Sequence, residues 1–299
     1  MQISWSWLVA LTLFSGAATA QSNPFWQHWS DGQAELNGYT LTQPRYGQSR
    51  PGRAVLVYVT EPFSARRGVK VDRYDPQNPD HRTVLKLNHV RKFQTGVYDY
   101  SVMTSVFVDP QRSFSPLKIS FSSQEWCGHM FQDTRFDETG AKVSINSYFD
   151  GESGQRSLDL GRNAIAEDAL FIVLRQLDTL KMRPGRQAAQ FVSSALQDRF
   201  LHTPAQVRAG TLEFVEETTE VEVPAGKFTT HTARWSVSGR TCEAAIEAAY
   251  PHRIVRWQCS DGESAALTGS KRMPYWRLNR EGDEAALEGL GLTPPRHQP

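Results

Sequence analysis

The chain has 299 residues, of which 33 are Lys or Arg and 32 are Asp or Glu. This near balance predicts no nucleic-acid partner, because proteins that bind nucleic acids carry a basic surplus. Hydrophobic residues make up 39% of the chain, and aromatic residues make up 11%. That composition supports a folded core and excludes a wholly disordered protein.

The first twenty residues have the pattern of a secretory signal peptide. An apolar run over residues 5–14 is followed by small residues that end in Ala18-Thr19-Ala20, an A-x-A cleavage site. The run is shorter than the roughly 20 residues of a membrane-spanning helix, and no later segment is long and apolar enough to span a bilayer. We therefore expect residues 1–20 to be a signal peptide, no transmembrane span after its cleavage, and an exported, periplasmic protein.

Alternation of apolar and polar residues, which is typical of β-strands, dominates the rest of the chain. The predicted strands cover residues 53–60, 84–90, 97–108, 117–123, 142–149, 210–223, 227–237, 242–249, 253–259 and 264–270. Short turns such as Asp150-Gly151 and Asp261-Gly262 separate them, and Asp-Gly between apolar runs indicates a hairpin. The chain lacks a strand–helix–strand rhythm, which disfavours a parallel sheet.

Two segments have the spacing of helices. Apolar residues recur at helical intervals over residues 164–180, before Pro184-Gly185, and a weaker helix is predicted over residues 283–290. The fold class we expect is mainly β, with a large curved antiparallel sheet or incomplete barrel packed around one or two short helices.

The expected domain organisation follows from these elements. Residues 21–291 would form a single β-rich domain, or two similar halves over about 21–160 and 161–291. Residues 292–299 would form a disordered tail, because they are rich in Pro and polar residues.

The second half of the chain resembles a known family. A segment from Asp168-Ala169-Leu170 to Lys181-Met182-Arg183-Pro184-Gly185 precedes Val223-Pro224-Ala225-Gly226-Lys227-Phe228, and Pro251-His252-Arg253-Ile254-Val255 follows. This layout resembles an uncharacterised family of exported bacterial proteins, a domain of unknown function with a VPAG-x-F signature. The resemblance implies a fold similar to the periplasmic lipoprotein carriers, which are incomplete barrels lined with apolar side chains. It implies no catalytic residues.

Three cysteines in an oxidising compartment leave one of them unpaired. A tight turn near Tyr250-Pro251 would place Cys242 and Cys259 directly opposite each other on neighbouring strands. We therefore expect a Cys242–Cys259 disulfide that closes a loop of about 17 residues, worth on the order of 3 kcal/mol in the chain-entropy model.

The remaining cysteine, Cys127, lies in a polar constellation. On a continuous strand, Glu125, Cys127 and His129 would share one face with Ser123, because side chains alternate. One hypothesis is a reactive thiolate with His129 as base and Glu125 orienting it. A second is a metal site formed by Cys127, His129 and His89. The alternative to both is that Cys127 is a small buried apolar residue and that its polar neighbours face the solvent. No motif calls for a cofactor.

The function we expect is non-catalytic binding of an apolar or amphipathic ligand, such as a lipid or a lipoprotein anchor, inside the curved sheet. The residues expected to line that cavity are Val57, Val59, Phe121, Tyr148 and Trp235. Two alternatives remain open. One is a thiol-dependent or metal-assisted hydrolase that uses Cys127 and His129. The other is a structural module that pairs with a partner strand through a sheet edge.

Overall fold

The computed structural model describes residues 24–161 and 164–293. The expected signal peptide, residues 1–20, and most of the expected tail lie outside the described residues. Leu292, with which that tail was expected to begin, is buried, so the ordered chain extends past residue 291.

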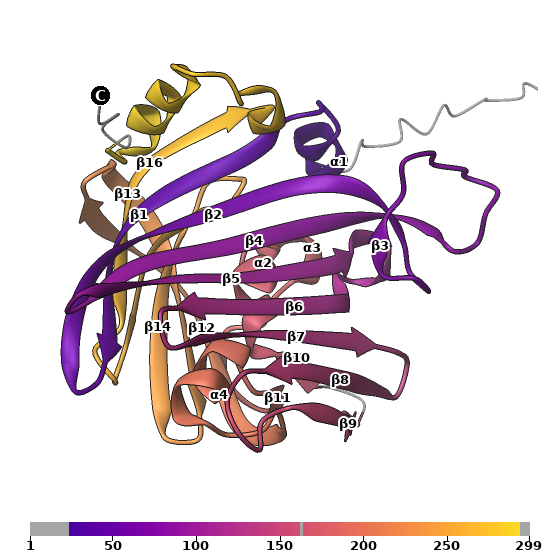
Figure 1. Cartoon of the computed structure of the whole chain (residues 1–299). Helices are drawn as coiled ribbons and strands as arrows, with labels where there is room; N and C mark the ends of the chain where they lie inside the picture. Colours follow the sequence, from indigo (N-terminus) through magenta and orange to yellow (C-terminus); the bar gives the residue numbers. More distant parts are fainter. Residues whose placement is uncertain (1–23, 162–163, 294–299) are drawn as a thin grey trace, which may run out of the picture.

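Within the described residues, 16 strands form one curved sheet, as the mainly β prediction requires (Figure 1). The strands are β1 (Ala34–Arg45), β2 (Gln48–Ser64), β3 (Val69–Lys70), β4 (His81–Thr95), β5 (Tyr98–Asp109), β6 (Ser115–Glu125), β7 (Gly128–Phe136), β8 (Gly140–Ser147), β9 (Gly154–Asp159), β10 (Ala164–Ala166), β11 (Gly185–Val192), β12 (Val207–Val223), β13 (Gly226–Val237), β14 (Arg240–Glu247), β15 (Ile254–Cys259) and β16 (Ser264–Met273). Their order is β10-β11-β12-β13-β14-β15-β16-β1-β2-β4-β5-β6-β7-β8-β9, and β3 pairs with β2. Neighbours are antiparallel, except that β10 and β11 are parallel.

Every predicted strand overlaps an observed strand, but the pattern missed β1, β3, β7, β9, β10 and β11. The β7 strand was not predicted because its inward side chains include Gln132 and Thr134, which are buried and hydrogen-bonded to each other. Polar residues on the buried face remove the alternation on which the prediction depends.

The helices are short. The α-helices are α1 (Pro24–Trp29), α2 (Leu170–Val173), α3 (Leu177–Leu180) and α4 (Ala195–Leu201), and the 3₁₀ helices are η1 (Pro110–Arg112), η2 (Glu167–Ala169), η3 (Tyr275–Arg277) and η4 (Asp283–Leu290). Among the residues described, none of these helices has the length and apolar character needed to cross a membrane.

The predicted single helix over residues 164–180 is wrong. Its residues form β10, η2, α2 and α3 in succession. The segment lies inside the curve of the sheet, where side chains on several sides of it are buried, including Leu170, Ile172 and Leu174. Contacts with surrounding strands, such as the Tyr58 hydroxyl donating to the Phe171 carbonyl at 2.9 Å, therefore decide its path.

The two faces of the sheet pack separately. The inner face holds the large core, in which side chains of α2 pack against inward residues such as Tyr58 and Trp257. On the outer face, η4 and Leu292 pack over β1 and β2. Val57 and Val59 belong to this outer cluster. They alternate along β2 with Leu56 and Tyr58, whose side chains point inward.

An ion pair ties residues 164–180, which we call the inner segment, to the sheet. Arg175, just after α2, contacts Glu35 of β1 at 2.9 Å, and both side chains are only 2% exposed. The guanidinium also donates to the Pro251 carbonyl and lies 4.1 Å from the centre of the Tyr58 ring. Burial alone would raise the pKa of Glu35, but the Arg175 charge, together with hydrogen bonds from His28, Arg175 and Asn37, outweighs it and lowers this pKa to about 2.

We expect Arg175→Met to lower the free energy of unfolding by about 3–5 kcal/mol, because it removes the buried cation that contacts the Glu35 carboxylate. Urea denaturation at pH 7 measures this loss. The control is Arg112→Met, which removes an exposed partner of Glu138 and should cost less than about 1 kcal/mol. Equal losses in both variants would contradict a special role for the buried pair.

Candidate functional site

The predicted row of Ser123, Glu125, Cys127 and His129 on one strand face is wrong. The β6 strand ends at Glu125 and β7 begins at Gly128, so Trp126 and Cys127 form the turn of a hairpin. Glu125 is buried on the inner face, whereas Cys127 is exposed at the turn and His129 is exposed on β7 opposite Gln124. The reversal of the chain at the turn separates residues that a continuous strand would align.

A carboxylate lies beside the Cys127 thiol. Glu125 Oε2 accepts a hydrogen bond from the Cys127 backbone N–H at 2.6 Å. The hydrogen bond between the Glu125 carboxylate and the thiol, with partial desolvation, raises the pKa of Cys127 above its ordinary value. This environment favours the protonated thiol over the nucleophilic thiolate.

The structure places His89 away from this turn, on the inner face of β4. Its ring lies 5.6 Å from the centres of the Phe171 and Trp257 rings, and Arg91 donates to it at 3.1 Å. Burial and the Arg91 charge lower the pKa of His89 well below its ordinary value, so the ring is neutral. Within the described ranges, no group of His, Cys, Asp and Glu side chains is arranged to hold a metal ion.

The five residues expected to line a cavity lie in different environments. Val57 and Val59 are on the outer face under η4, and Phe121 is buried in the inner core. Tyr148 is exposed at the β8–β9 turn, and Trp235 faces inward beside Glu167. The structure therefore does not gather these side chains around one space.

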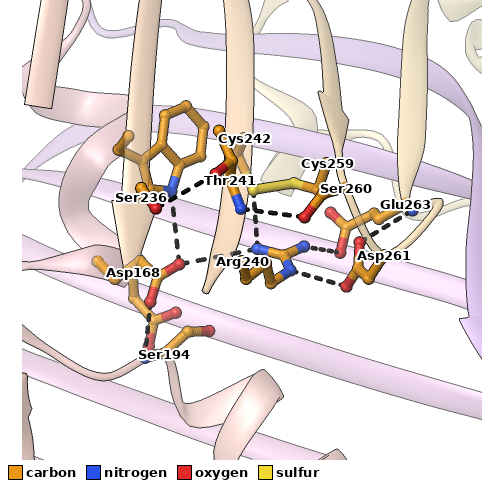
Figure 2. Close-up of polar contacts among 12 residues, drawn as sticks. Asp168, Ser194, Ser236, Arg240, Thr241, Cys242, Cys259, Ser260, Asp261 and Glu263 are labelled. Atoms are coloured by element: carbon orange, nitrogen blue, oxygen red, sulfur yellow. Dashed lines mark hydrogen bonds and ion pairs between the residues drawn. A yellow bond between two sulfur atoms is a disulfide. The ribbon is translucent and has the colours of Figure 1, made fainter. Parts of the chain in front are cut away.

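A disulfide joins Cys242 and Cys259, which pair directly across β14 and β15. Figure 2 shows the Arg240 guanidinium between this disulfide and the acids of the β15–β16 turn. Arg240 lies 2.9 Å from Cys242 Sγ, 2.7 Å from Asp261 and 3.0 Å from Glu263. Its guanidinium therefore links the disulfide to the neighbouring hairpin.

Two acids connect this network to the inner segment. Glu167 lies 3.7 Å from Arg240 and accepts hydrogen bonds from Trp235 and from the Ser194 backbone. Asp168 accepts from the Ala195 N–H at 3.0 Å, at the start of α4. Burial and the Asp168 charge raise the pKa of Glu167 from its ordinary 4.5 to about 7.

The space inside this polar network is small. The cavity lined by His89, Arg91, Glu167, Arg240 and Glu263 has a volume of about 50 Å³. A water molecule occupies roughly 30 Å³ of liquid, so the cavity has room for one or two waters and none for an organic ligand. The network therefore holds the inner segment against β13–β16.

A larger groove opens where the inner segment meets β11 and β12. It has a volume of about 420 Å³, within the usual range of ligand sites. Its apolar lining comprises Ile165, Leu180, Met182, Ala188, Ala189, Leu212 and Phe214, most of which are only partly buried. Lys181 and Arg183 are exposed on its rim, and no described carboxylate makes an ion pair with either of them.

The groove could not be located from the sequence. The sequence assigns the Leu180-to-Gly185 motif to the end of a helix and to a family resemblance, and neither assignment shows that it supplies one wall of the groove. The sequence signal for the groove was the pair of cations, Lys and Arg, on either side of Met182. Two cations beside an apolar residue are the groups that would bind the head group and the chain of an amphiphile. The opposite wall, from Leu212 and Phe214, is known only once β12 is placed.

We expect Glu167→Gln to have a higher free energy of unfolding than the unaltered chain, by a difference that grows as the pH rises. A carboxyl whose folded-state pKa is raised loses stability as pH increases from about 4.5 through about 7, because ionisation in the folded state is disfavoured. The amide has no such loss, so the variant should gain up to about 3 kcal/mol at pH 8 and little at pH 4.5. Urea denaturation across this range measures the difference. Glu217→Gln, at an exposed site, should leave the pH profile unchanged, and a parallel profile for Glu167→Gln would contradict the expectation.

We expect Glu125→Gln to make Cys127 react faster with iodoacetamide at pH 7.5, by about threefold or more, because the carboxylate that disfavours the thiolate is removed. Thiol mass labelling over time measures the rates. In urea, which unfolds the turn, Cys127 should react with iodoacetamide at the same rate in the unaltered chain and in Glu125→Gln. Equal rates in the folded proteins would show that Glu125 does not control the thiol.

Comparisons with known proteins agree with this fold. No protein-family model matches the chain, and no curated protein matches it. Among solved structures, the chain is similar to a β-barrel-like protein of the domain of unknown function DUF1849 from Brucella abortus, with a TM-score of 0.50 at 10% identity over 80% of this chain and 97% of that one. A candidate exported protein with a YmcC-like fold from Bacteroides fragilis matches with a TM-score of 0.21 at 15% identity, over 80% of this chain and 94% of that one. The fold is thus similar to that of the β-barrel-like protein.

Proposed function

We propose that this protein is an exported, periplasmic binding protein that holds an amphiphile with an apolar chain and an anionic head group. The groove between the inner segment and β12 carries this proposal, because it combines an apolar floor with a cationic rim. Export is supported by the signal-peptide pattern of residues 1–20 and by the disulfide, since disulfides persist outside the cytoplasm.

The filled interior favours the groove over a central cavity. Large side chains such as Phe171, Trp257 and Tyr39 occupy the inside of the sheet, and the cavity that Phe171 and Trp257 line has a volume of about 50 Å³. Apolar surface that a ligand could bury therefore remains at the sheet end formed by β11 and β12, where Leu212 is partly exposed. An acyl chain in the groove would bury this surface and gain the free energy of apolar burial.

The rim favours an anionic head group. Lys181 and Arg183 flank Met182 and are exposed to solvent, and none of the described acidic side chains lines the groove. A carboxylate or phosphate of the ligand would supply the negative charge that the described neighbours do not provide, with charge-assisted hydrogen bonds.

We expect Leu212→Glu to weaken binding of a dansyl-labelled fatty acid by about tenfold or more, because it places a like charge on the apolar floor. Fluorescence titration of the purified chain measures the affinity. The matched control is Leu278→Glu, which changes a partly exposed leucine in the segment after η3 and should bind as the unaltered chain does.

The rim is tested with a second pair of probes. Lys181→Gln with Arg183→Gln should weaken binding of the fatty acid but leave binding of the uncharged fatty alcohol unchanged. If the unaltered chain binds neither probe, or if Leu212→Glu and Leu278→Glu bind alike, the groove is not the site.

A further inference from the structure

The most exposed large apolar side chains gather at one end of the sheet. The turns β1–β2, β4–β5, β6–β7 and β8–β9 lie at the same end, because successive antiparallel strands reverse at alternate ends. With the last residue of α4, they carry a set that we call the tip surface: Tyr46 (56% exposed), Val97 (80%), Trp126 (72%), Tyr148 (73%) and Leu201 (66%). Among the described residues, no other large apolar side chain is as exposed as these five.

Ring contacts connect the first three of these turns. The Tyr46 hydroxyl lies 2.8 Å from that of Tyr100 on β5. The Tyr98 ring lies 6.0 Å from that of Tyr100 and 6.4 Å from that of Trp126. The β1–β2, β4–β5 and β6–β7 turns therefore form one surface supported from below by aromatic packing.

Backbone contacts add the other two members. The Tyr148 N–H donates to the carbonyl of His129 on β7 at 3.1 Å, which holds Tyr148 beside the β6–β7 hairpin. Leu201 follows Phe200, whose carbonyl accepts from Arg45 at the β1–β2 turn at 3.0 Å. The five residues of the tip surface therefore lie on adjacent turns at this end of the sheet and at the end of α4.

The turns themselves do not require apolar residues. Two-residue hairpin turns favour Asn, Asp and Gly. Tyr46 adopts a φ of 56°, a left-handed conformation that a tyrosine rarely occupies. At the same end of the sheet, the β13–β14 and β15–β16 turns contain Ser238-Gly239 and Asp261-Gly262. Polar residues therefore form turns in this sheet as well as apolar ones do. Exposed apolar residues at the other turns indicate a contact with a partner outside the chain.

We infer that the tip surface docks on a lipid bilayer that contains anionic phospholipids. Trp and Tyr are the side chains that favour the boundary between head groups and acyl chains, because each has an apolar ring and a polar edge. The paired turn residues at 46–47, 96–97 and 126–127 carry no charge, so inserting them removes no ionised group from water. Separate projecting turns suit a fluid surface, whereas a rigid partner would need a matching socket for each.

Charges behind the tips complement such a surface. Arg53 of β2 and Lys92 of β4 lie directly opposite each other and are both exposed on the outer face. No ion pair joins either of them to a described carboxylate, and like charges in this register repel each other. Asp99, on β5, is the exposed acid nearest to this pair along the strands. Anionic head groups would relieve the repulsion between the two cations.

The test measures sedimentation of the chain from Gln21 onward with vesicles of phosphatidylethanolamine and phosphatidylglycerol. We expect Val97→Ser with Trp126→Ser to weaken vesicle binding by about tenfold or more, since two inserted apolar side chains are lost. The matched control is Val69→Ser with Tyr74→Ser, which changes partly exposed apolar residues at the opposite end of the sheet and should bind as the unaltered chain does. Arg53→Gln with Lys92→Gln should weaken binding to these vesicles but not to vesicles of phosphatidylcholine alone.

Three outcomes would overturn the inference. The unaltered chain fails to sediment with the vesicles, or the tip and control variants bind equally. Alternatively, without vesicles, the tip variant alone changes the sedimentation velocity of the protein, which would identify a second copy as the occupant. The inference does not depend on the groove, because the vesicle assay uses no fatty-acid probe and the variants lie on other elements.

Discussion

The buried contact between Glu35 and Arg175 fixes the position on which the rest of the interior depends. A long curved sheet has an apolar inner face that must be covered, and this chain covers it with its own inner segment and with α4. Because neither charge tolerates burial alone, the segment has one favourable position against β1. Phe171 and the neighbouring side chains of α2 are then set against Tyr58 and Trp257.

A second network holds the same segment from the opposite side. Arg240 lies between Glu263 and Glu167, so strands β13–β16 and the start of α4 meet around one guanidinium. The disulfide beside it fixes the register of β14 and β15. Between the two networks the interior is packed, with a cavity of about 50 Å³. The groove of about 420 Å³ lies beyond them, against β11 and β12.

This arrangement separates the two surfaces that we propose for binding. The groove is formed by the inner segment and β12, whereas the tip surface is carried by hairpin turns of β1–β9 and by the end of α4. A protein with both would contact a membrane through its turns while holding an amphiphile elsewhere. The exposed thiol of Cys127 lies at one of those turns, where its hydrogen bond with Glu125 raises its pKa.

The sequence alone determined the sheet, most of its strands and the opposition of Cys242 and Cys259, because alternation and turn residues are local properties of the chain. It predicted a helix over residues 164–180 and an aligned row at Glu125, Cys127 and His129, and both were wrong. The spacing of apolar residues records only that a segment is buried, and not which strands surround it. Only the tertiary structure decided that Arg175 meets Glu35, that the interior is filled, and that Lys181 and Leu212 share a groove. Those contacts join residues far apart in the chain, and no local pattern encodes them.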